Sequence, residues 1–133
     1  MTTSHPDSNR ILCFGDSNTW GYVPATNGDR YGGEIRWPGV LQGQLGSQYT
    51  VIEEALNGRT TVWDDPMKPD RNGSQHLPML LESHTPIDLV IIALGVNDLK
   101  HYFNLRAVDI ALGVQTLANA VIQSQAGRLE PNG

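Results

Sequence analysis

Three short apolar runs recur along the chain, and each ends at a small or charged residue. Residues 11–14 stop at Gly15, residues 50–52 run into two glutamates, and residues 88–94 stop at Gly95. Continuous apolar runs that contain β-branched residues are typical of strands covered on both faces, as in parallel sheets. The pattern therefore predicts three strands buried within one sheet.

Between these runs, apolar residues recur at helical spacing. Residues 37–45 have a proline near their start and a glycine directly after them, and residues 76–82 form a shorter candidate helix. The clearest helix is predicted over residues 105–123, where apolar residues recur at steps of four, three and four. This stripe consists of Ile110, Val114, Leu117 and Val121, and it is widened by Ala111, Leu112, Ala118 and Ile122. Such an arc is broad for a helix that covers a single sheet face.

The alternation of strands and helices predicts a parallel α/β sheet with right-handed crossovers. Two long polar loops, at 24–36 and 63–75, interrupt the pattern. A chain of 133 residues is long enough for one domain with its own core. We expect that domain to span residues 10–125, with a disordered lead-in at 1–9 and a flexible tail at 126–133.

Composition narrows the choice of partners and cofactors. The net charge is −5, from 9 basic and 14 acidic residues, and no basic cluster is present, so neither nucleic acid nor an anionic membrane is an expected partner. The single cysteine, Cys13, lies in the first apolar run and is expected to be a small buried hydrophobe. No Cys/His spacing indicates a metal site, and no cofactor is expected. The longest apolar run is too short for a membrane span and no apolar signal segment is present, which favours a cytoplasmic protein.

Small and polar residues follow each predicted strand. The sequence GDSN follows the first strand, NGRTT the second and GVND the third. Each has a structural explanation: Asp16 or Ser17 can cap the following helix, Asn57-Gly58 is a common turn dipeptide, and Asn97-Asp98 can cap the start of a helix. However, ligands of open parallel sheets bind beyond the carboxyl ends of the strands, so all three motifs are expected at one rim. Their joint placement there favours a functional site.

These motifs resemble the blocks of the SGNH (GDSL-type) hydrolases, which are serine esterases and lipases. GDSN matches the first block, the glycine of NGRTT the second and GVND the third, in the family's order. The longer stretches RILCFGDSNTWGY, VIEEALNGRTT, DLVIIALGVNDLK and DIALGV are similar to the arylesterase and acyltransferase branch, over roughly residues 10–125. The resemblance implies a flavodoxin-like three-layer sandwich, with the strands in the order 2-1-3.

The resemblance also implies a role for each motif residue. Ser17 would be the nucleophile of a serine esterase that hydrolyses small carboxylic esters. Negative charge develops on the carbonyl oxygen during such a reaction, and it needs hydrogen-bond donors already in place. By resemblance these donors are the N–H groups of Ser17 and Gly58 and the side-chain amide of Asn97. Supporting or pocket-lining roles are expected for a further set, in which the aromatic residues are equally explained by ordinary packing: Asp16, Thr60, Asp98, Trp20, Tyr22 and Trp63.

The nucleophile needs a base, which the family supplies from a histidine in a late D-x-x-H block. No such block follows the last predicted helix. His5 lies in the polar lead-in, and His76 and His84 flank the short helix as surface or packing residues. His101 follows Asp98 with the D-x-x-H spacing, but it overlaps the third block and is not the family's fourth.

Without the late D-x-x-H block, the chain resembles the N-terminal portion of an SGNH domain. The run at 88–94 would then be an open sheet edge with unpaired backbone groups, and the last helix would lack part of its partner surface. We therefore expect the chain to form a homo-oligomer or to pair with a complementing chain. Ultracentrifugation that found only monomer at low micromolar concentration would contradict this expectation.

Two other functions remain open at this stage. The first is a catalytically impaired fragment that keeps the oxyanion pocket and binds acyl-like ligands or a partner chain, because a serine without its base loses orders of magnitude in rate. The second is a flavodoxin-like binder of phosphate or flavin, since GDSNTWG is superficially similar to such loops. The carboxylate of Asp16 would oppose a phosphate there.

Overall fold

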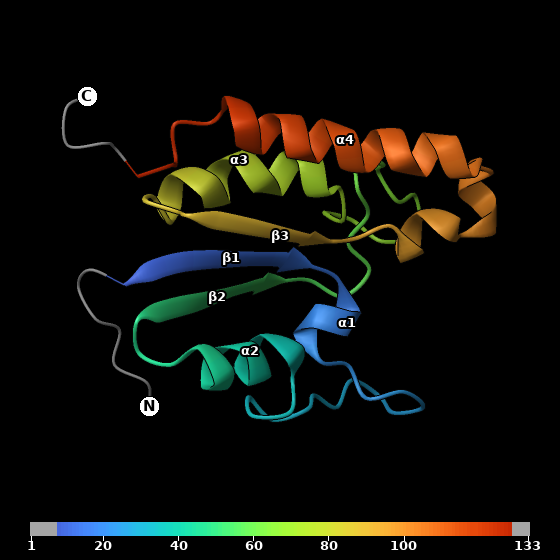
Figure 1. The fold of residues 1–133 in the computed structure, drawn as a ribbon. Helices are drawn as coiled ribbons and strands as arrows, with labels where there is room; N and C mark the ends of the chain where they lie inside the picture. The colour runs from blue at the N-terminus through green and yellow to red at the C-terminus, as the bar shows by residue number, and fades with distance from the viewer. Residues whose placement is uncertain (1–7, 129–133) are drawn as a thin grey trace.

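A computed structural model of the chain describes residues 8–128, which form a parallel three-stranded sheet. Strands β1 (Asn9–Gly15), β2 (Tyr49–Ala55) and β3 (Leu89–Ala93) lie in the order β2-β1-β3 (Figure 1). The predicted strand order 2-1-3 is therefore confirmed. Because Gly15 is paired with both Ala55 and Ala93, the three strands end at one level and deliver their following loops to the same rim.

β2 is longer than the sequence pattern predicts, because its polar residues find partners. Glu53 forms an ion pair with Arg36 at 2.9 Å, and Glu54 contacts His84 at 2.8 Å. A buried or half-buried carboxylate costs little when it is paired in this way. The two glutamates that ended the predicted run therefore belong to the strand.

Helices cover both faces of the sheet, as Figure 1 shows. The short α1 (Ser17–Trp20) and α2 (Trp37–Leu45) lie on one side, and α3 (Gly73–Ser83) and α4 (Ala107–Gln123) pack together on the other. Two single-turn 3₁₀ helices, η1 (Val96–Leu99) and η2 (His101–Phe103), connect β3 to α4. The three-layer α/β sandwich expected from the resemblance is present.

Two helix starts differ from the predicted ones because of capping. α3 begins three residues early, since the side chain of Asn72 accepts a hydrogen bond from the Ser74 N–H at 3.0 Å. α4 begins two residues late, since Asp109 accepts a bond from the Arg106 N–H at 2.9 Å and closes a capping box. Both signals are local, but neither lies on the apolar stripe from which the helices were predicted.

The main core lies between the sheet and the α3–α4 layer. Leu12 and Phe14 of β1 point into it and meet buried leucines of both helices: Leu77, Leu81 and Leu117. Cys13 is also buried and free, and burial, with a smaller contribution from Glu53, raises the pKa of its thiol to about 11. The prediction that Cys13 is a small buried hydrophobe is confirmed.

The apolar arc of α4 is only partly covered. Leu117 is buried, whereas Leu112 is 54% exposed and Ile122 is 78% exposed. The broad predicted arc therefore exceeds the surface that the described residues offer it.

The two edges of the sheet differ in whether their backbone groups are covered. Along β2, the Gln42 side chain of α2 accepts a bond from the Val51 N–H at 2.7 Å and donates to the Tyr49 carbonyl at 2.8 Å. Such contacts block strand addition. Within residues 8–128, β3 pairs only with β1, so its outer edge is open. The open edge predicted for the third strand is confirmed for this part of the chain.

The ends of the described chain are packed against the amino ends of the strands. Ser8 is buried, and its hydroxyl lies 2.6 Å from that of Thr50, while the Ala126 carbonyl accepts a bond from the Ile87 N–H at 2.7 Å. The rest of the predicted lead-in and tail, residues 1–7 and 129–133, lies outside the described residues. The domain limits at 10 and 125 stay a prediction.

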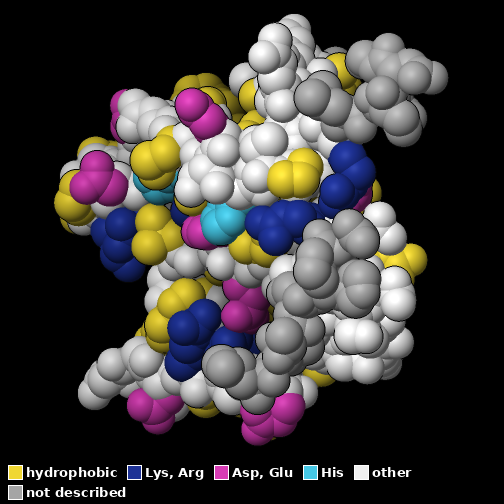
Figure 2. Space-filling view, turned by 90° about the vertical axis from the view of Figure 1, so that its left-hand side faces the viewer, with side chains coloured by type: hydrophobic (Ala, Val, Ile, Leu, Met, Phe, Trp, Pro, Cys, Tyr) yellow, Lys and Arg dark blue, Asp and Glu magenta, His cyan; other side chains and the backbone are white. Residues whose placement is uncertain are grey.

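The face at the amino ends of the strands is mixed in charge. Figure 2 views the molecule from this side and shows basic and acidic side chains next to one another. Arg128 and Asp88 form one such pair at 3.0 Å. Across residues 8–128, no helix is long and apolar enough to cross a membrane.

Candidate active site

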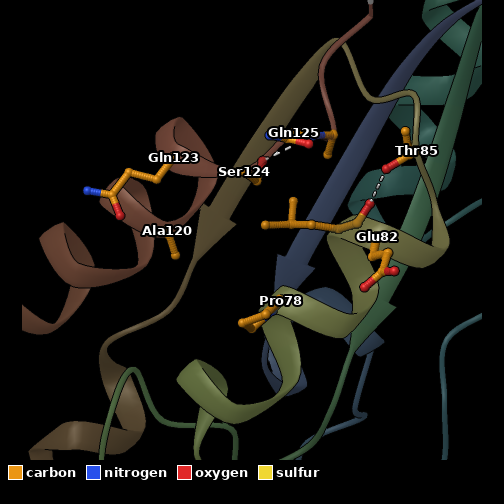
Figure 3. Close-up of a pocket in the computed structure, with 9 residues that line it drawn as sticks. Pro78, Glu82, Thr85, Ala120, Gln123, Ser124 and Gln125 are labelled. Atoms are coloured by element: carbon orange, nitrogen blue, oxygen red, sulfur yellow. Dashed lines mark hydrogen bonds between the residues drawn. The ribbon is translucent and has the colours of Figure 1, made fainter.

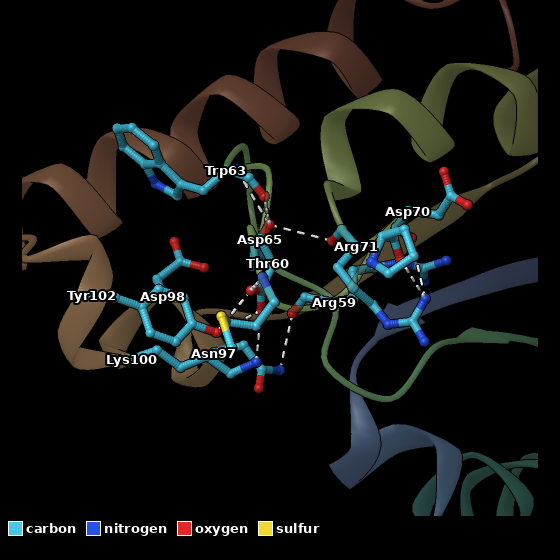
Figure 4. Close-up of polar contacts among 12 residues, drawn as sticks. Arg59, Thr60, Trp63, Asp65, Asp70, Arg71, Asn97, Asp98, Lys100 and Tyr102 are labelled. Atoms are coloured by element: carbon cyan, nitrogen blue, oxygen red, sulfur yellow. Dashed lines mark hydrogen bonds and ion pairs between the residues drawn. The ribbon is translucent and has the colours of Figure 1, made fainter.

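Three loops meet beyond the carboxyl ends of the strands, and hydrogen bonds join them. The Leu56 N–H donates to the Gly15 carbonyl at 3.1 Å, which ties the loop after β2 to the loop after β1. The Asn97 side-chain amide donates to the Arg59 carbonyl at 3.0 Å, which ties the loop after β3 to the loop after β2 (Figure 4). The structure therefore brings the three predicted motifs to one rim.

Ser17 is the first residue of α1 and is half-buried. Asp16 caps this helix, because its Oδ1 atom accepts a bond from the Asn18 N–H at 2.9 Å. Burial raises the pKa of Asp16, against the opposing effects of the Asn18 bond and the nearby Arg59 charge. The capping explanation of Asp16 is confirmed, and no side chain among residues 8–128 forms a hydrogen bond with the Ser17 hydroxyl.

Gly58 occupies a turn that requires glycine. Its φ is +82°, a region that residues with a side chain rarely adopt, and the Arg59 N–H closes the turn on the Leu56 carbonyl at 3.1 Å. A Cβ atom at Gly58 would lie 3.4 Å from Arg71 Cδ, which is ordinary contact. The turn explanation is therefore confirmed, and the requirement for glycine comes from backbone conformation rather than from lack of space.

Asn97 and Asp98 lie in η1 and reach across to the loop after β2. Asp98 is fully buried and accepts bonds from the Thr61 N–H at 3.0 Å and the Thr61 hydroxyl at 2.5 Å. No side chain caps η1. The alternative that this pair caps a helix start is therefore wrong, since both side chains instead join neighbouring loops.

Thr60 supports the rim by a route that differs from that of Asp98. Its hydroxyl donates to the Trp63 carbonyl at 2.5 Å, and its N–H donates to the Arg71 carbonyl at 2.8 Å. These bonds shape the loop between β2 and α3. Thr61, which the sequence did not single out, is the residue that holds Asp98.

The three aromatic candidates are distributed over two loops. The Trp20 and Tyr22 rings lie 6.4 Å apart, with the Arg30 guanidinium 4.6 Å from the Trp20 ring. The Tyr22 hydroxyl donates to the Thr26 carbonyl at 2.7 Å. The Trp63 indole N–H is buried without a hydrogen-bond partner among the described residues. These contacts are packing contacts, and a pocket-lining role stays a prediction.

A carboxylate that sequence reasoning missed joins the loops after β2 and β3. Asp65 accepts bonds from the Lys100 ammonium at 2.8 Å and from the Tyr102 hydroxyl at 2.7 Å (Figure 4). Burial favours its neutral form, but these bonds outweigh burial and lower the pKa of Asp65 to about 2. No motif connects residues so far apart in the sequence, so no local signal identifies this cluster.

None of the three described histidines is bonded to Ser17. His76 Nδ1 accepts a bond from the Arg59 side chain at 3.2 Å, and His84 contacts Glu54 at 2.8 Å. His101 is exposed and packs edge-on against the Tyr102 ring, with 5.4 Å between centroids. Because Asp98 is engaged by Thr61, the local D-x-x-H spacing does not correspond to an Asp–His pair.

One well-defined cavity lies away from this rim. A pocket of about 590 Å³ opens between α3 and α4, with Pro78 and Glu82 on the α3 side and Ala120 and Gln123 on the α4 side (Figure 3). It does not include Ser17, and residues 8–128 contain no cluster of three metal-ligating side chains.

Comparison with known proteins identifies esterases with the same fold. An aryl esterase from M. smegmatis is 50% identical with a TM-score of 0.88, over 90% of this chain and 57% of that protein. A carbohydrate acetylesterase from Sinorhizobium meliloti is 46% identical with a TM-score of 0.88, over 93% of this chain and 59% of that one. An arylesterase from Vibrio mimicus is 38% identical over 74% of this chain and 42% of its own length.

The chain thus spans about half the length of the relatives it matches. A family model for the GDSL-like lipase/acylhydrolases matches residues 13–130, which include all three rim motifs. The resemblance drawn from those motifs is confirmed, and the chain belongs to the GDSL-like lipase/acylhydrolase family.

Proposed function

We propose that this chain supplies the nucleophile and the oxyanion-binding groups of a serine esterase that acts on small carboxylic esters. The observation that carries the proposal is the rim at which Ser17, Gly58 and Asn97 follow strands ending at one level. Its loops are joined by hydrogen bonds, so the groups are held before a substrate arrives. Preorganised donors of this kind are the largest single contribution to catalysis in many acyl-transfer enzymes.

In the proposed reaction, the Ser17 oxygen forms a bond to the acyl carbon of the ester. The carbonyl electron pair moves onto its oxygen, and the N–H groups of Ser17 and Gly58 and the Asn97 amide stabilise the negative charge. The bond to the alcohol then breaks, and the proton lost by Ser17 leaves with that alcohol. Water attacks the acyl-serine, which releases the acid and restores the hydroxyl.

The substrate class rests on the relatives. An arylesterase and a carbohydrate acetylesterase share close to half of their residues with this chain over the matched region. Both names describe esters with a small acyl group or a simple aromatic alcohol. We therefore favour short-chain esters, with acetyl esters as the first choice, and no cofactor.

The base that accepts the Ser17 proton is proposed to lie outside the described residues of this chain. The histidines at 76, 84 and 101 all have other neighbours. Within residues 8–128 the outer edge of β3 is open, and Leu112 and Ile122 of α4 are exposed. These features favour a second copy or a complementing chain seated at this edge.

Hydrolysis of p-nitrophenyl acetate by the purified chain tests the proposal. We expect turnover that Ser17→Ala removes and that Ser47→Ala, at an exposed serine of another loop, leaves intact. Equal rates for the chain and its Ser17→Ala variant would overturn it and leave an acyl-binding fragment. If turnover depends on Ser17, loss of activity in His101→Ala would identify His101 as the base.

A further inference from the structure

The Arg59 side chain connects the carboxyl ends of two strands. Its guanidinium donates to the Gly15 carbonyl at 3.2 Å and to the Glu54 carbonyl at 2.8 Å. It also lies 4.2 Å from the Phe14 ring centroid, and the residue is only 5% exposed. Gly15 is two residues before Ser17, so the side chain fixes the start of the proposed nucleophile turn.

The backbone of Arg59 meets the third loop. Its carbonyl accepts the bond from the Asn97 amide at 3.0 Å, and its N–H donates to the Leu56 carbonyl at 3.1 Å. Arg59 is therefore in contact with the strand-end segments of β1 and β2 and with the loop after β3. It also directly follows Gly58, so any shift of Arg59 displaces the Gly58 N–H.

His76 of α3 also bonds to the guanidinium. Its Nδ1 atom accepts a bond from Arg59 Nε at 3.2 Å, which requires that nitrogen to be unprotonated. Burial lowers the pKa of His76. The positive charges of Arg59 and Arg71 lower this pKa further, whereas Asp70 raises it. The ring is thus kept in the form that accepts this bond.

A buried guanidinium is a costly way to stabilise a fold. Burial lowers the pKa of Arg59 to about 10, yet the group stays charged at neutral pH. Replacing buried charges by apolar residues of similar size is often neutral or stabilising. A planar fork with several donors does, however, fix several acceptors in one geometry, which an apolar residue or a lysine does not.

We infer that Arg59, oriented by the His76 ring, is a positioning residue that sets the Asn97 amide and the Ser17 turn relative to the Gly58 N–H. This inference rests on the proposed ester-hydrolysis site. It is distinct from a catalytic role, because Arg59 acts through other residues. It predicts that loss of the guanidinium disturbs Asn97, which its side chain does not touch.

The test compares Arg59→Met with Arg10→Met in the full 133-residue chain. Arg10 is a suitable control, because it donates to the Pro86 carbonyl at 2.9 Å and the His84 carbonyl at 3.3 Å near the opposite end of β1. The readout is the side-chain amide signal of Asn97 in ¹⁵N NMR spectra, recorded with the pH titration of His76. Neither measurement depends on turnover.

With Arg59→Met we expect the two Asn97 amide proton signals to shift towards the positions of a free asparagine side chain and the pKa of His76 to rise towards its ordinary value. With Arg10→Met both signals stay unchanged. Identical Asn97 signals in the wild type and Arg59→Met, at any degree of destabilisation, would overturn the inference and leave Arg59 as a packing residue.

A kinetic arm separates the inference from the proposed function. If the chain shows Ser17-dependent turnover, Arg59→Met is expected to lower kcat by about 100-fold with little change in KM, since misplacement by about 1 Å costs that much. An equal loss in Arg10→Met would contradict positioning. If no Ser17-dependent turnover exists, the proposed function fails, while the NMR result still decides the role of Arg59.

Discussion

The Asn97 side chain donates a hydrogen bond to the carbonyl oxygen of Arg59 at 3.0 Å, across 38 residues of sequence. A side-chain amide has two hydrogens, and this bond uses one of them. The bond therefore fixes the orientation of the amide while leaving its second hydrogen for another acceptor. Under the proposed function that acceptor is the oxygen of the ester.

Asn97→Ala should lower kcat for p-nitrophenyl acetate by about 10²–10³-fold, the usual loss for one oxyanion donor. KM should change little, because the donor acts mainly on charge that develops in the transition state. Steady-state kinetics beside Asn119→Ala, an exposed asparagine of α4, provide the measurement. A loss below threefold would exclude Asn97 from the oxyanion site.

Gly58→Ala and Gly46→Ala form a matched pair. Both glycines have a positive φ, +82° and +81°, which residues with a side chain rarely adopt, so each alanine should lower the free energy of unfolding by about 1–3 kcal/mol. Only Gly58 lies at the rim, so only its variant should also lose esterase activity. Urea unfolding and kinetics of both variants decide this, and parallel loss of activity in Gly46→Ala would point to a general effect of stability.

Thr61→Val should destabilise the fold through Asp98. Valine has a similar shape but cannot donate, so one oxygen of the fully buried Asp98 would lose its 2.5 Å bond. An unsatisfied buried group costs about 1–3 kcal/mol, and we expect a loss of that size in urea unfolding. Thr116→Val, whose hydroxyl bonds within the exposed face of α4, should change stability by less than about 0.5 kcal/mol.

Local sequence patterns predicted which residues lie at the rim, because these residues directly follow the strands. Gly15, Gly58 and Asn97 follow apolar runs, and parallel strands place the residues that follow them at one rim. The strand order, by contrast, came from the family resemblance, since apolar patterns do not specify which strands are neighbours. Both predictions are confirmed by the sheet β2-β1-β3 and its register.

The side-chain partners at the rim were not predictable from those patterns. Asp98 pairs with Thr61 across 37 residues and Asp65 pairs with Lys100 across 35, through loops whose paths no periodicity describes. For the same reason, a supporting role was predicted for Thr60 and not for Thr61, which is the residue that bonds to Asp98. Arg59 directly follows Gly58 in the second motif, but the sequence does not show that its side chain is buried. That burial depends on the carbonyl oxygens of Gly15 and Glu54, which accept its hydrogen bonds.

Asp65 should make the free energy of unfolding depend on pH in the acidic range. Its pKa is lowered from 3.8 to about 2 because the bonds from Lys100 and Tyr102 outweigh burial. The ionised carboxylate therefore favours folding above about pH 4, and this stabilisation is lost as the pH falls from about 4 to about 2. Urea midpoints between pH 2 and 7 should fall less steeply in Asp65→Asn than in the wild type over this interval. Asp29→Asn, at an exposed loop aspartate, should leave the slope unchanged.

Exposed apolar residues of α4 should drive self-association at the open side of β3. Leu112 and Ile122 are 54% and 78% exposed, and the outer edge of β3 has no partner strand within residues 8–128. Charges placed on an apolar patch oppose its burial, so Leu112→Lys with Ile122→Lys should shift the chain towards monomer in sedimentation velocity runs at low micromolar concentration. Ile35→Lys, at an exposed isoleucine just before α2, should leave the distribution as in the wild type. A wild type that sediments as a single monomeric species would contradict self-association and leave a different, complementing chain as the partner to seek.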